Sequence, residues 1–317
     1  MTQPLPTSQD VHAAAARLQG RVVRTPMLRN AVLDKQTGAT VLIKPEVLQR
    51  TGSFKLRGAT NALLCIPQEI RARGVVAYSS GNHAQGVACA AASLGVAATI
   101  VMPADAPAIK RDSTAFWGAR IVPYDRFTGN REEIAARIAA ETGATLIPPY
   151  DHPDVIAGQG TAALELAQDA AAAGLAMDMF ITPAGGGGLT AGSALALSDV
   201  SPGTRIHTAE PEGWDDTARS LAAGERLRND MQGSPLCDAL LAPVPGELTF
   251  AINSRLVTSG FAVSDEEVRA AQKFAARALK LVVEPGGAVA LAALLSGKLN
   301  AAAQTVGIML SGGNADL

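Results

Sequence analysis

The chain has 317 residues, 48% of them apolar and 18% charged, with a net charge of -2, which fits one large or two medium domains with a sizeable core. Because this charge is close to zero, the composition gives no electrostatic attraction to nucleic acids or membranes. The three cysteines lie far apart, which argues against a zinc site or a disulfide framework, and residues 1–10 lack the segments of an export signal, so we expect a cytoplasmic protein.

Short runs rich in β-branched residues alternate with alanine-rich segments of helical character. In chain order the pattern predicts strands at 39–44, 74–79, 97–102 and 119–124, each followed by a helix, at 54–66, 82–95, 108–118 and 131–143. After the proline-rich 147–153, it predicts a helix at 158–174, a strand at 178–184 and a second α/β series that runs through 205–210 to 306–314. This alternation predicts an α/β fold with parallel sheets and crossover helices, and a domain crossing near 147–153.

Four consecutive glycines, Gly185, Gly186, Gly187 and Gly188, separate the strand predicted at 178–184 from a helix. Without Cβ atoms in the way, successive backbone N–H groups can converge on an anion, and the helix N-terminus adds its positive dipole. The run lacks the spacing of a dinucleotide fingerprint and the Lys-Ser/Thr of a P-loop. The alternative is a flexible linker, but linkers seldom sit between a buried strand and an alanine-rich helix. We therefore predict a phosphate-binding loop.

A second polar turn, Ser79, Ser80, Gly81 and Asn82, also lies between a predicted strand and a helix. Serine and asparagine are common helix N-caps, so capping is one interpretation. The other is a second anion site suited to a carboxylate. His83 by itself adds little, because a single histidine near a helix start is more often structural than catalytic.

Lys55 stands in TGSFKLRGA, where small residues leave space around it. A lone lysine is usually a solvated charge, but together with a phosphate loop and a carboxylate site it indicates an amine that condenses with a phosphate-bearing aldehyde, for which pyridoxal phosphate is the obvious cofactor. Ser311 follows an apolar strand and either forms a tight turn or donates a hydrogen bond to an unprotonated pyridine nitrogen. A neutral ring is a weaker electron sink, which favours elimination over transamination.

In chain order, TGSFKLRGA, SSGNHAQG, PAGGGGLTAG, EPGGAVALAAL and SGGNADL resemble the motifs of fold-type II pyridoxal phosphate enzymes, in the branch of serine/threonine dehydratases and serine racemases that includes 3-hydroxyaspartate dehydratases. The resemblance spans nearly the whole chain. It implies a homodimer whose subunit has two domains of open, mostly parallel twisted sheet flanked by helices. Residues 1–52 and 150–317 would form the large cofactor-binding domain, and residues 53–149 the small domain that closes over the cofactor.

The resemblance also implies which residues bind the cofactor. Lys55 would hold it covalently, Phe54 would pack on the ring face, Asn82 would hydrogen-bond the ring 3-oxygen, and Ser311 would meet the ring nitrogen. The backbone amides of the four glycines and of Leu189 would bind the phosphate.

The implied activity is a dehydratase, or ammonia-lyase, that converts a 3-hydroxy amino acid such as L-threonine or L-serine to a 2-oxo acid and ammonia by β-elimination, with freed Lys55 as the base. The substrate carboxylate would lie among Ser79, Ser80, Gly81, Asn82 and His83.

Several points about the substrate and the reaction stay open. Arg131 matches a position that can meet a second carboxylate, which would make 3-hydroxyaspartate the substrate, although it can equally be a surface charge. Ser80 matches the second base of serine racemases, facing the substrate opposite Lys55, so a racemase stays an alternative, as does a β-replacement enzyme with the same cofactor. Asp238 belongs to a segment, LCDALLAP, that departs from the Ala-Asp-Gly usual in the family. Because this segment should approach the substrate, the side chain of the substrate stays open. A phosphate-binding protein with an incidental lysine is the alternative from another class.

The segment AEPEGWDD spaces Glu210 and Asp216 so that both can share a hard cation with the Trp214 carbonyl. The alternative is a solvated acidic loop. The same place in serine racemase-like enzymes holds Mg²⁺ or Ca²⁺, so we expect a structural Mg²⁺, with Ca²⁺ or Mn²⁺ as substitutes.

Overall fold

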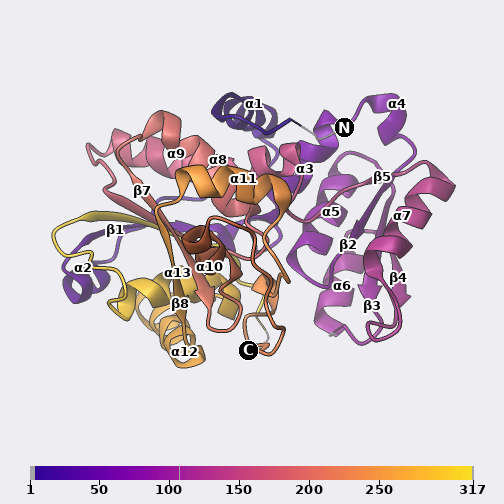
Figure 1. The fold of residues 1–317 in the computed structure, drawn as a ribbon. Helices are drawn as coiled ribbons and strands as arrows, with labels where there is room; N and C mark the ends of the chain where they lie inside the picture. The colour runs from indigo at the N-terminus through magenta and orange to yellow at the C-terminus, as the bar shows by residue number, and fades with distance from the viewer. Residues whose placement is uncertain (1–3, 107, 316–317) are drawn as a thin grey trace.

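The computed structural model describes residues 4–106 and 108–315. Two parallel β-sheets lie side by side with helices packed against them, the larger sheet on the left in Figure 1. This is the α/β architecture that the sequence predicts. The larger sheet has the order β1-β9-β6-β7-β8, and its strands are β1 (Thr40–Pro45), β6 (Met179–Pro183), β7 (Arg205–Pro211), β8 (Ser259–Val263) and β9 (Thr305–Leu310).

Successive residues of the central strands point to opposite faces of the larger sheet. Ile181 and Ile308 pack into a core on one face, and Phe180 and Met309 pack into a core on the other. The first face is covered by α2 (Ala31–Thr37), α12 (Asp265–Phe274) and α13 (Pro285–Leu295), and the second by α8 (Pro153–Ala172) and α9 (Gly188–Val200).

The smaller sheet has the order β4-β3-β2-β5, also entirely parallel, and is built from one continuous part of the chain. Val75 and Ile100 face α3 and α5, whereas Val76 and Val101 face α7. The elements of this sheet are β2 (Val75–Tyr78), β3 (Ala98–Pro103), β4 (Arg120–Tyr124), β5 (Thr145–Leu146), α3 (Lys55–Cys65), α5 (Asn82–Ser93), α6 (Ala108–Phe116) and α7 (Arg131–Thr142).

The strands and helices predicted between residues 39 and 143 are confirmed within two residues of their predicted bounds. The helix predicted from residue 158 begins earlier, at Pro153, because proline suits the first helical position and the His152 side chain caps the Asp154 amide. Further elements are α1 (Ser8–Leu18), α4 (Gln68–Arg71), α10 (Asp216–Ala223), α11 (Glu247–Leu256), η1 (Glu46–Leu48), η2 (Asp238–Leu240) and the π-helix η3 (Ala275–Leu279).

Helices α8 and α9 pack at very close range through glycines. A Cβ atom on Gly192 would lie 2.2 Å from the Ile156 carbonyl oxygen, and one on Gly160 would lie 2.4 Å from the Gly192 carbonyl oxygen. Because only glycine permits this approach, α9 is fixed against α8 in one position. The N-terminus of α9, with the glycine run before it, is thereby placed against the middle of α8.

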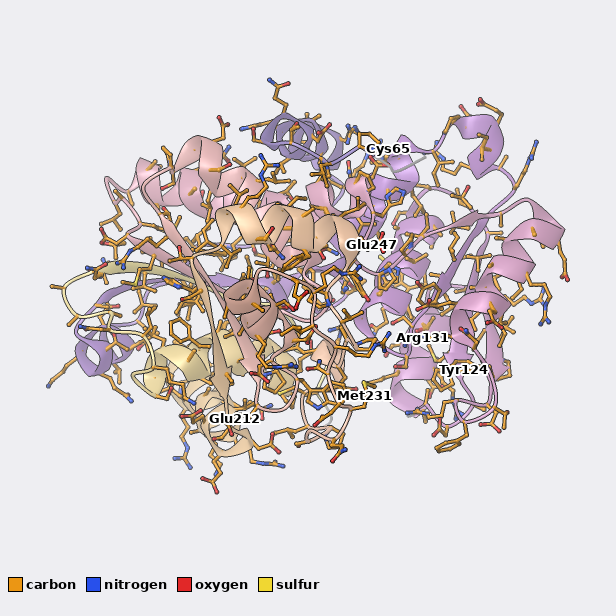
Figure 2. All side chains as sticks on the ribbon, viewed as in Figure 1. Cys65, Tyr124, Arg131, Glu212, Met231 and Glu247 are labelled. Carbon is orange, nitrogen blue, oxygen red and sulfur yellow. The ribbon has the colours of Figure 1, made fainter. Side chains whose placement is uncertain are left out.

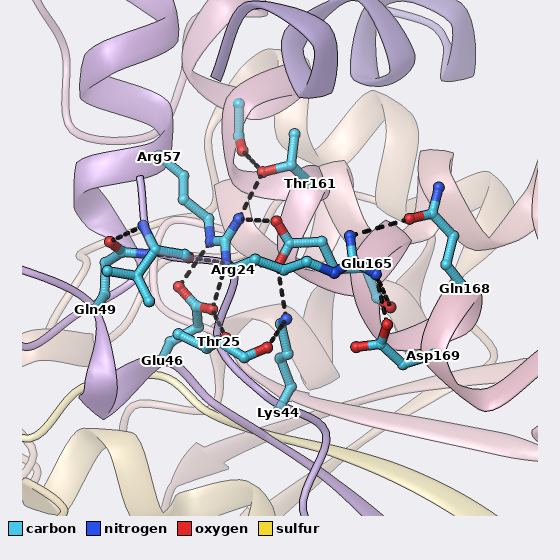
Figure 3. Close-up of polar contacts among 12 residues, drawn as sticks. Arg24, Thr25, Lys44, Glu46, Gln49, Arg57, Thr161, Glu165, Gln168 and Asp169 are labelled. Atoms are coloured by element: carbon cyan, nitrogen blue, oxygen red, sulfur yellow. Dashed lines mark hydrogen bonds and ion pairs between the residues drawn. The ribbon is translucent and has the colours of Figure 1, made fainter. Parts of the chain in front are cut away.

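Arg57 lies fully buried on α3 and joins several parts of the chain (Figure 3). Its guanidinium donates two hydrogen bonds to Glu46 and two to Glu165, all of 2.8 Å. Lys44 donates to Glu165 as well, at 2.6 Å. Two cations therefore neutralise two carboxylates, and the first turn of α3 is tied to β1, η1 and α8.

Among residues 4–106 and 108–315, no helix has both the length and the apolar character needed to cross a membrane.

Candidate active site

A cavity opens between the two sheets, where parallel strands of both sheets reach their carboxyl ends. Strand β2 leads into the turn at Ser79, β6 into the glycine run and β9 into Ser311. The cavity is lined by every residue predicted to bind cofactor or substrate: Phe54, Lys55, Ser79, Ser80, Gly81, Asn82, His83, Arg131, Gly185, Gly186, Gly187, Gly188, Leu189, Asp238 and Ser311.

Lys55 is the first residue of α3 and points into this cavity. Its Nζ donates to the Pro149 carbonyl at 2.7 Å and lies 5.2 Å from the centre of the Phe54 ring. Burial lowers the pKa of Lys55 to about 8, and the charge of Glu284 offsets part of that shift. Near neutral pH this amine is deprotonated far more often than an ordinary lysine, which suits a nucleophile and a base.

Two carbonyl groups of the glycine run accept hydrogen bonds from side chains of α11. Thr249 donates to the Gly186 carbonyl at 2.7 Å, and Asn253 donates to that of Gly187 at 3.3 Å. Gly187 has a φ of 90°, a conformation that favours glycine. Within residues 4–106 and 108–315, none of the amides from Gly185 to Leu189 donates a hydrogen bond to a protein atom. These free donors at the N-terminus of α9 could hold an anion, and we call them the anion cradle. Gly187 and Gly188 are buried and Gly188 begins α9, so the interpretation as a flexible linker is wrong.

The turn before α5 does not cap that helix. Gly81 occupies the N-cap position and no side chain accepts from the first-turn amides; the Ser79 hydroxyl instead accepts from the Gly81 amide at 3.1 Å. His83 donates from Nε2 to the Ile147 carbonyl at 2.9 Å, and burial together with the nearby Lys55 charge lowers its pKa to about 3. His83 is therefore a neutral residue of the cavity wall.

Asn82 connects the two sides of the cavity. Its Nδ2 donates to Glu284 at 2.6 Å, and its Oδ1 accepts from Asn314 at 2.7 Å. Burial raises the pKa of Glu284 to about 7, although the hydrogen bond from Asn82 opposes the shift. This carboxyl can therefore hold or release a proton near neutral pH.

Ser311 directly follows β9, lines the cavity and is 4% exposed. Its carbonyl accepts from the Phe54 amide at 3.1 Å, which sets the start of α3 beside the end of β9. In the part of the chain that the structure describes, its hydroxyl has no hydrogen-bond partner. A ligand atom in the cavity could accept or donate there.

The comparisons with known proteins agree with this geometry. Residues 18–312 match the family described as pyridoxal-phosphate dependent enzyme. The chain belongs to this family. It is 44% identical to an L-threo-3-hydroxyaspartate ammonia-lyase of Saccharomyces cerevisiae, over 99% of this chain and 94% of that protein.

Two solved structures of related enzymes have nearly the same fold. Threonine deaminase of T.th. superposes with a TM-score of 0.93 at 44% identity, covering 98% of this chain and 99% of that one. Maize serine racemase superposes with a TM-score of 0.94 at 38% identity, covering 99% and 95%. The resemblance drawn from the five motifs is thus confirmed at the level of family and fold.

The cavity fits the cofactor of this pyridoxal phosphate family. Free amides suit its phosphate, the buried amine of Lys55 suits its aldehyde, and the Ser311 hydroxyl suits its ring nitrogen. The donor set therefore matches the three polar ends of one flat ligand.

Two cations lie on the side of the cavity formed by the smaller sheet. Arg131, labelled in Figure 2, begins α7, and its guanidinium carbon lies 5.6 Å from the centre of the Tyr78 ring. Lys110 of α6 pairs with Asp238 of η2, which joins the two sides of the cavity mouth. The Asp238 carboxylate is half exposed and is held by a cation of the cavity.

Glu210, Trp214 and Asp216 lie outside the cavity, where β7 leads into α10. The Glu210 carboxylate accepts from the amides of Thr217 and Ala218 at 2.9 and 2.8 Å. Burial and the charge of Asp216 hold the pKa of Glu210 well above its ordinary value, and burial raises the pKa of Asp216 to about 7. Glu210, Trp214 and Asp216 are buried, although Glu212 and Gly213 between them are exposed, so the interpretation as a solvated loop is wrong for the predicted ligands.

A hard cation fits this acidic pair. Asp216 Oδ2 is buried and has no hydrogen-bond partner, and no amide or side chain of the described residues donates to the Trp214 carbonyl. No group of three or more His, Cys, Asp or Glu side chains suited to a metal occurs in residues 4–106 and 108–315. The two carboxylates and the Trp214 carbonyl would hold a cation only with water as further ligands.

Sequence reasoning missed several residues of the cavity: Tyr78, Gln85, Lys110, Tyr150, Gln159, Glu284 and Asn314. Glu284 and Asn314 lie inside two of the motifs, EPGGAVALAAL and SGGNADL, but the motifs do not show that both meet Asn82. Gln159 and Lys110 lie in helices where nothing in the local pattern separates them from surface residues. Only long-range packing brings them to the site.

Proposed function

We propose that the chain is a pyridoxal phosphate-dependent ammonia-lyase of 3-hydroxy amino acids, with 3-hydroxyaspartate as the preferred substrate class. The observation that carries the proposal is the buried amine of Lys55, whose lowered pKa coincides with free backbone amides and the Ser311 hydroxyl in one cavity. L-Threonine and L-serine, which come first on the motifs alone, become second candidates. Arg131 and Lys110 favour a substrate with a second carboxylate, and the yeast relative bears the name of such an enzyme.

In this proposal the residues of the cavity divide the work of cofactor binding. The amides of Gly185 to Leu189 hold the phosphate, Phe54 packs on the ring, and Ser311 meets the ring nitrogen. Bound pyridoxal phosphate supplies an aldehyde that condenses with amines and a ring that stabilises negative charge at the substrate α-carbon. Asn82 meets the ring 3-oxygen and is itself oriented by Glu284 and Asn314.

Lys55 moves the proton. In its neutral form, Nζ takes the proton from the α-carbon, which allows the β-hydroxyl to leave with its bonding electrons. Ser79, Ser80 and Gly81 bind the α-carboxylate, and Arg131 with Lys110 binds the distal one. Water then adds to the released product, which yields a 2-oxo acid and ammonia.

Racemisation is the second candidate function, because Ser80 lines the same cavity as Lys55. A racemase needs a base on each face of the α-carbon, and a serine hydroxyl can serve as the second. Maize serine racemase has the same fold. Chiral analysis of the recovered substrate tests this candidate, because unchanged optical purity would exclude racemase activity.

Three further features belong to the proposal. A structural Mg²⁺, replaceable by Ca²⁺ or Mn²⁺, would bind Glu210, Asp216 and the Trp214 carbonyl; the unpartnered Asp216 Oδ2 supports it. Residues 1–52 and 150–317 would form a large domain that the small domain, 53–149, closes upon. A homodimer in the cytoplasm remains a prediction.

Absorbance and substrate assays test the proposal. Wild-type protein given pyridoxal phosphate should show a visible band that borohydride bleaches and that Lys55→Ala lacks; no band in wild-type protein would end the enzyme proposal. Ammonia release is then measured for L- and D-serine, L- and D-threonine and the isomers of 3-hydroxyaspartate.

Arg131→Met tests the substrate class. We expect it to raise KM for 3-hydroxyaspartate by about 10- to 100-fold, the loss of one charge-assisted hydrogen bond, and to leave serine and threonine within about threefold. Arg126→Met, which removes an exposed ion pair with Asp105, is the control. Equal changes for all substrates would argue against a distal carboxylate at Arg131.

A further inference from the structure

Gln159 is a buried side chain of the cavity whose polar atoms have no partner. It lies on α8, is 1% exposed, and neither Oε1 nor Nε2 makes a hydrogen bond within the described part of the chain. A buried carboxamide without partners lowers stability, because it gives up its hydrogen bonds to water and gains none. Such a group in a binding cavity indicates a ligand that supplies the missing partner.

Its surroundings fix where the carboxamide points. A Cβ on Gly58 would lie 2.9 Å from Gln159 Cγ, so the stem of the side chain passes over α3 where only a glycine leaves space. A Cβ on Gly188 would lie 2.8 Å from Gln159 Oε1. The head group therefore lies against the first residue of α9, beside the free amides of the glycine run.

The anion cradle lacks a charged donor of its own. Residues Gly185 to Leu189 carry no cation, and Lys55 is occupied by its role toward the aldehyde in the proposed function. A phosphate accepts hydrogen bonds at three oxygens and carries nearly two negative charges near neutral pH. The Nε2 group of a glutamine has two N–H donors, and rotation of the carboxamide can turn them toward the cradle.

We infer that Gln159 is a phosphate-binding residue, which donates from Nε2 to the cofactor phosphate held by the glycine run. The inference rests on the proposed function, and it adds to the backbone cradle a side chain from a different helix. It also explains why α8 carries a buried carboxamide without protein partners. The missing hydrogen bonds make the apoprotein less stable, and binding of the phosphate restores one of them, which increases the affinity for the cofactor.

The test compares two ligands that differ only in the phosphate, pyridoxal phosphate and pyridoxal, in two variants. Gln159→Met keeps the volume and removes the donors, and Gln159→Glu keeps the shape and puts a negative charge beside the phosphate. We expect Gln159→Met to raise Kd for pyridoxal phosphate by about 10- to 100-fold and Gln159→Glu to raise it further, with Kd for pyridoxal within about twofold of wild type. Gln85→Met, at a glutamine of the cavity wall on α5, is the control and should leave the ratio of the two Kd values unchanged.

Thermal unfolding of the apoprotein adds a readout that does not depend on Lys55. The Gln159→Met apoprotein should have a Tm equal to or above that of the wild-type apoprotein, because the substitution removes two unpartnered polar atoms. Inorganic phosphate should raise the Tm of Gln159→Met by less than it raises the Tm of wild type. Equal loss of affinity for pyridoxal and pyridoxal phosphate, or a lower Tm of the apoprotein, would show a residue that only supports the loop and would overturn the inference. Failure of the proposed function is distinguishable, since wild type itself would then give no visible band.

Discussion

Burial, rather than a neighbouring cation, lowers the pKa of Lys55 to about 8. The charge of Glu284 acts in the opposite direction and stabilises the Lys55 ammonium. The pKa of Glu284 is itself raised by burial to about 7, so the charge beside Lys55 changes near neutral pH. The lysine and the glutamate therefore titrate as neighbours whose proton states affect each other.

The rate at which the apoenzyme incorporates pyridoxal phosphate should follow the neutral form of Lys55. An amine with pKa about 8 is mostly protonated at pH 6 and mostly neutral at pH 9, so the rate should rise about tenfold per pH unit below pH 8 and level off above it. Stopped-flow growth of the visible band between pH 6 and 10 measures this. A midpoint near pH 10 would mean that Lys55 is not buried in solution.

Glu284→Gln should move that midpoint to lower pH, because it removes the negative charge that stabilises the Lys55 ammonium. The glutamine can still accept from Asn82, so the geometry of the cavity is kept. The same stopped-flow experiment checks the shift. An upward shift would contradict the assignment of Glu284 as the charge that acts on Lys55.

At the scale of elements, the helix pair α8 and α9 sets the position of the glycine run. Their contact at Gly160 and Gly192 is close enough that a single methyl group would collide with backbone. Backbone atoms cannot rotate aside as a side chain can, so the helices would have to separate. The cradle therefore depends on residues outside the cavity.

Gly192→Ala should lower the free energy of unfolding by about 1–3 kcal/mol or more and weaken binding of pyridoxal phosphate, because α9 must shift. Gly203→Ala is the matched control, since a Cβ there meets no atom within 4 Å. Urea unfolding and cofactor titration check both effects. If the two variants behave alike, the close contact does not position the loop.

The acidic pair at the start of α10 should make stability depend on divalent cations. The pKa of Asp216 in the folded chain, about 7, exceeds its ordinary value of 3.8, so without a cation the free energy of unfolding falls as pH rises between these values. At pH 8, Mg²⁺ at 100 times its Kd should add about 2.7 kcal/mol, or roughly 5–10 °C in Tm.

Asp216→Asn should abolish this response to Mg²⁺ and should be at least as stable as wild type in chelator, because the charge that is costly to bury is gone. Differential scanning fluorimetry with EDTA and Mg²⁺ at pH 8 measures both. A Tm of wild-type protein that is indifferent to EDTA and to Mg²⁺ would exclude the cation site.

At the scale of the whole molecule, a buried cluster, the Arg57 cluster, joins distant parts of the chain; its members are Lys44, Glu46, Arg57 and Glu165. It links α3, next to the smaller sheet, with β1 and η1 of the larger sheet's side and with α8 (Figure 3). Lys55 is two residues from Arg57, so the same bonds hold in place the end of α3 that carries Lys55. The cluster is balanced, and loss of any one member leaves an unpaired buried charge.

Arg57→Met should therefore lower the free energy of unfolding by about 3–5 kcal/mol, since Glu46 would stay buried without its main partner. Arg24→Met removes an exposed ion pair with Asp169 and should cost less than about 1 kcal/mol. Chemical unfolding measures both. If the two variants lost similar amounts of free energy of unfolding, burial would not make the ion pairs of Arg57 more important for stability than an exposed pair.

The sequence by itself determined the local elements and the chemistry of the site. Strand and helix periods predicted the elements between residues 39 and 143 because each depends on neighbours within a few positions. The glycine run predicted a phosphate-binding loop, and the lysine flanked by small residues predicted a reactive amine. Both predictions were possible because the absence of Cβ atoms and the chemistry of an amine do not depend on the fold. β8 was not predicted because its five residues, SGFAV, lack a clear alternation, and only Val263 among them is fully buried.

Only the tertiary structure decided how these parts act on one another. The link from Asn82 to Glu284, the pair of Lys110 with Asp238, the unpartnered carboxamide of Gln159 and the lowered pKa of Lys55 all arise between residues distant in the chain. Burial and long-range contact set each of them, and neither has a local signature. The candidate reacting groups could therefore be predicted from the sequence, whereas the packing of two sheets around one cavity determined their proton states and their hydrogen-bond partners.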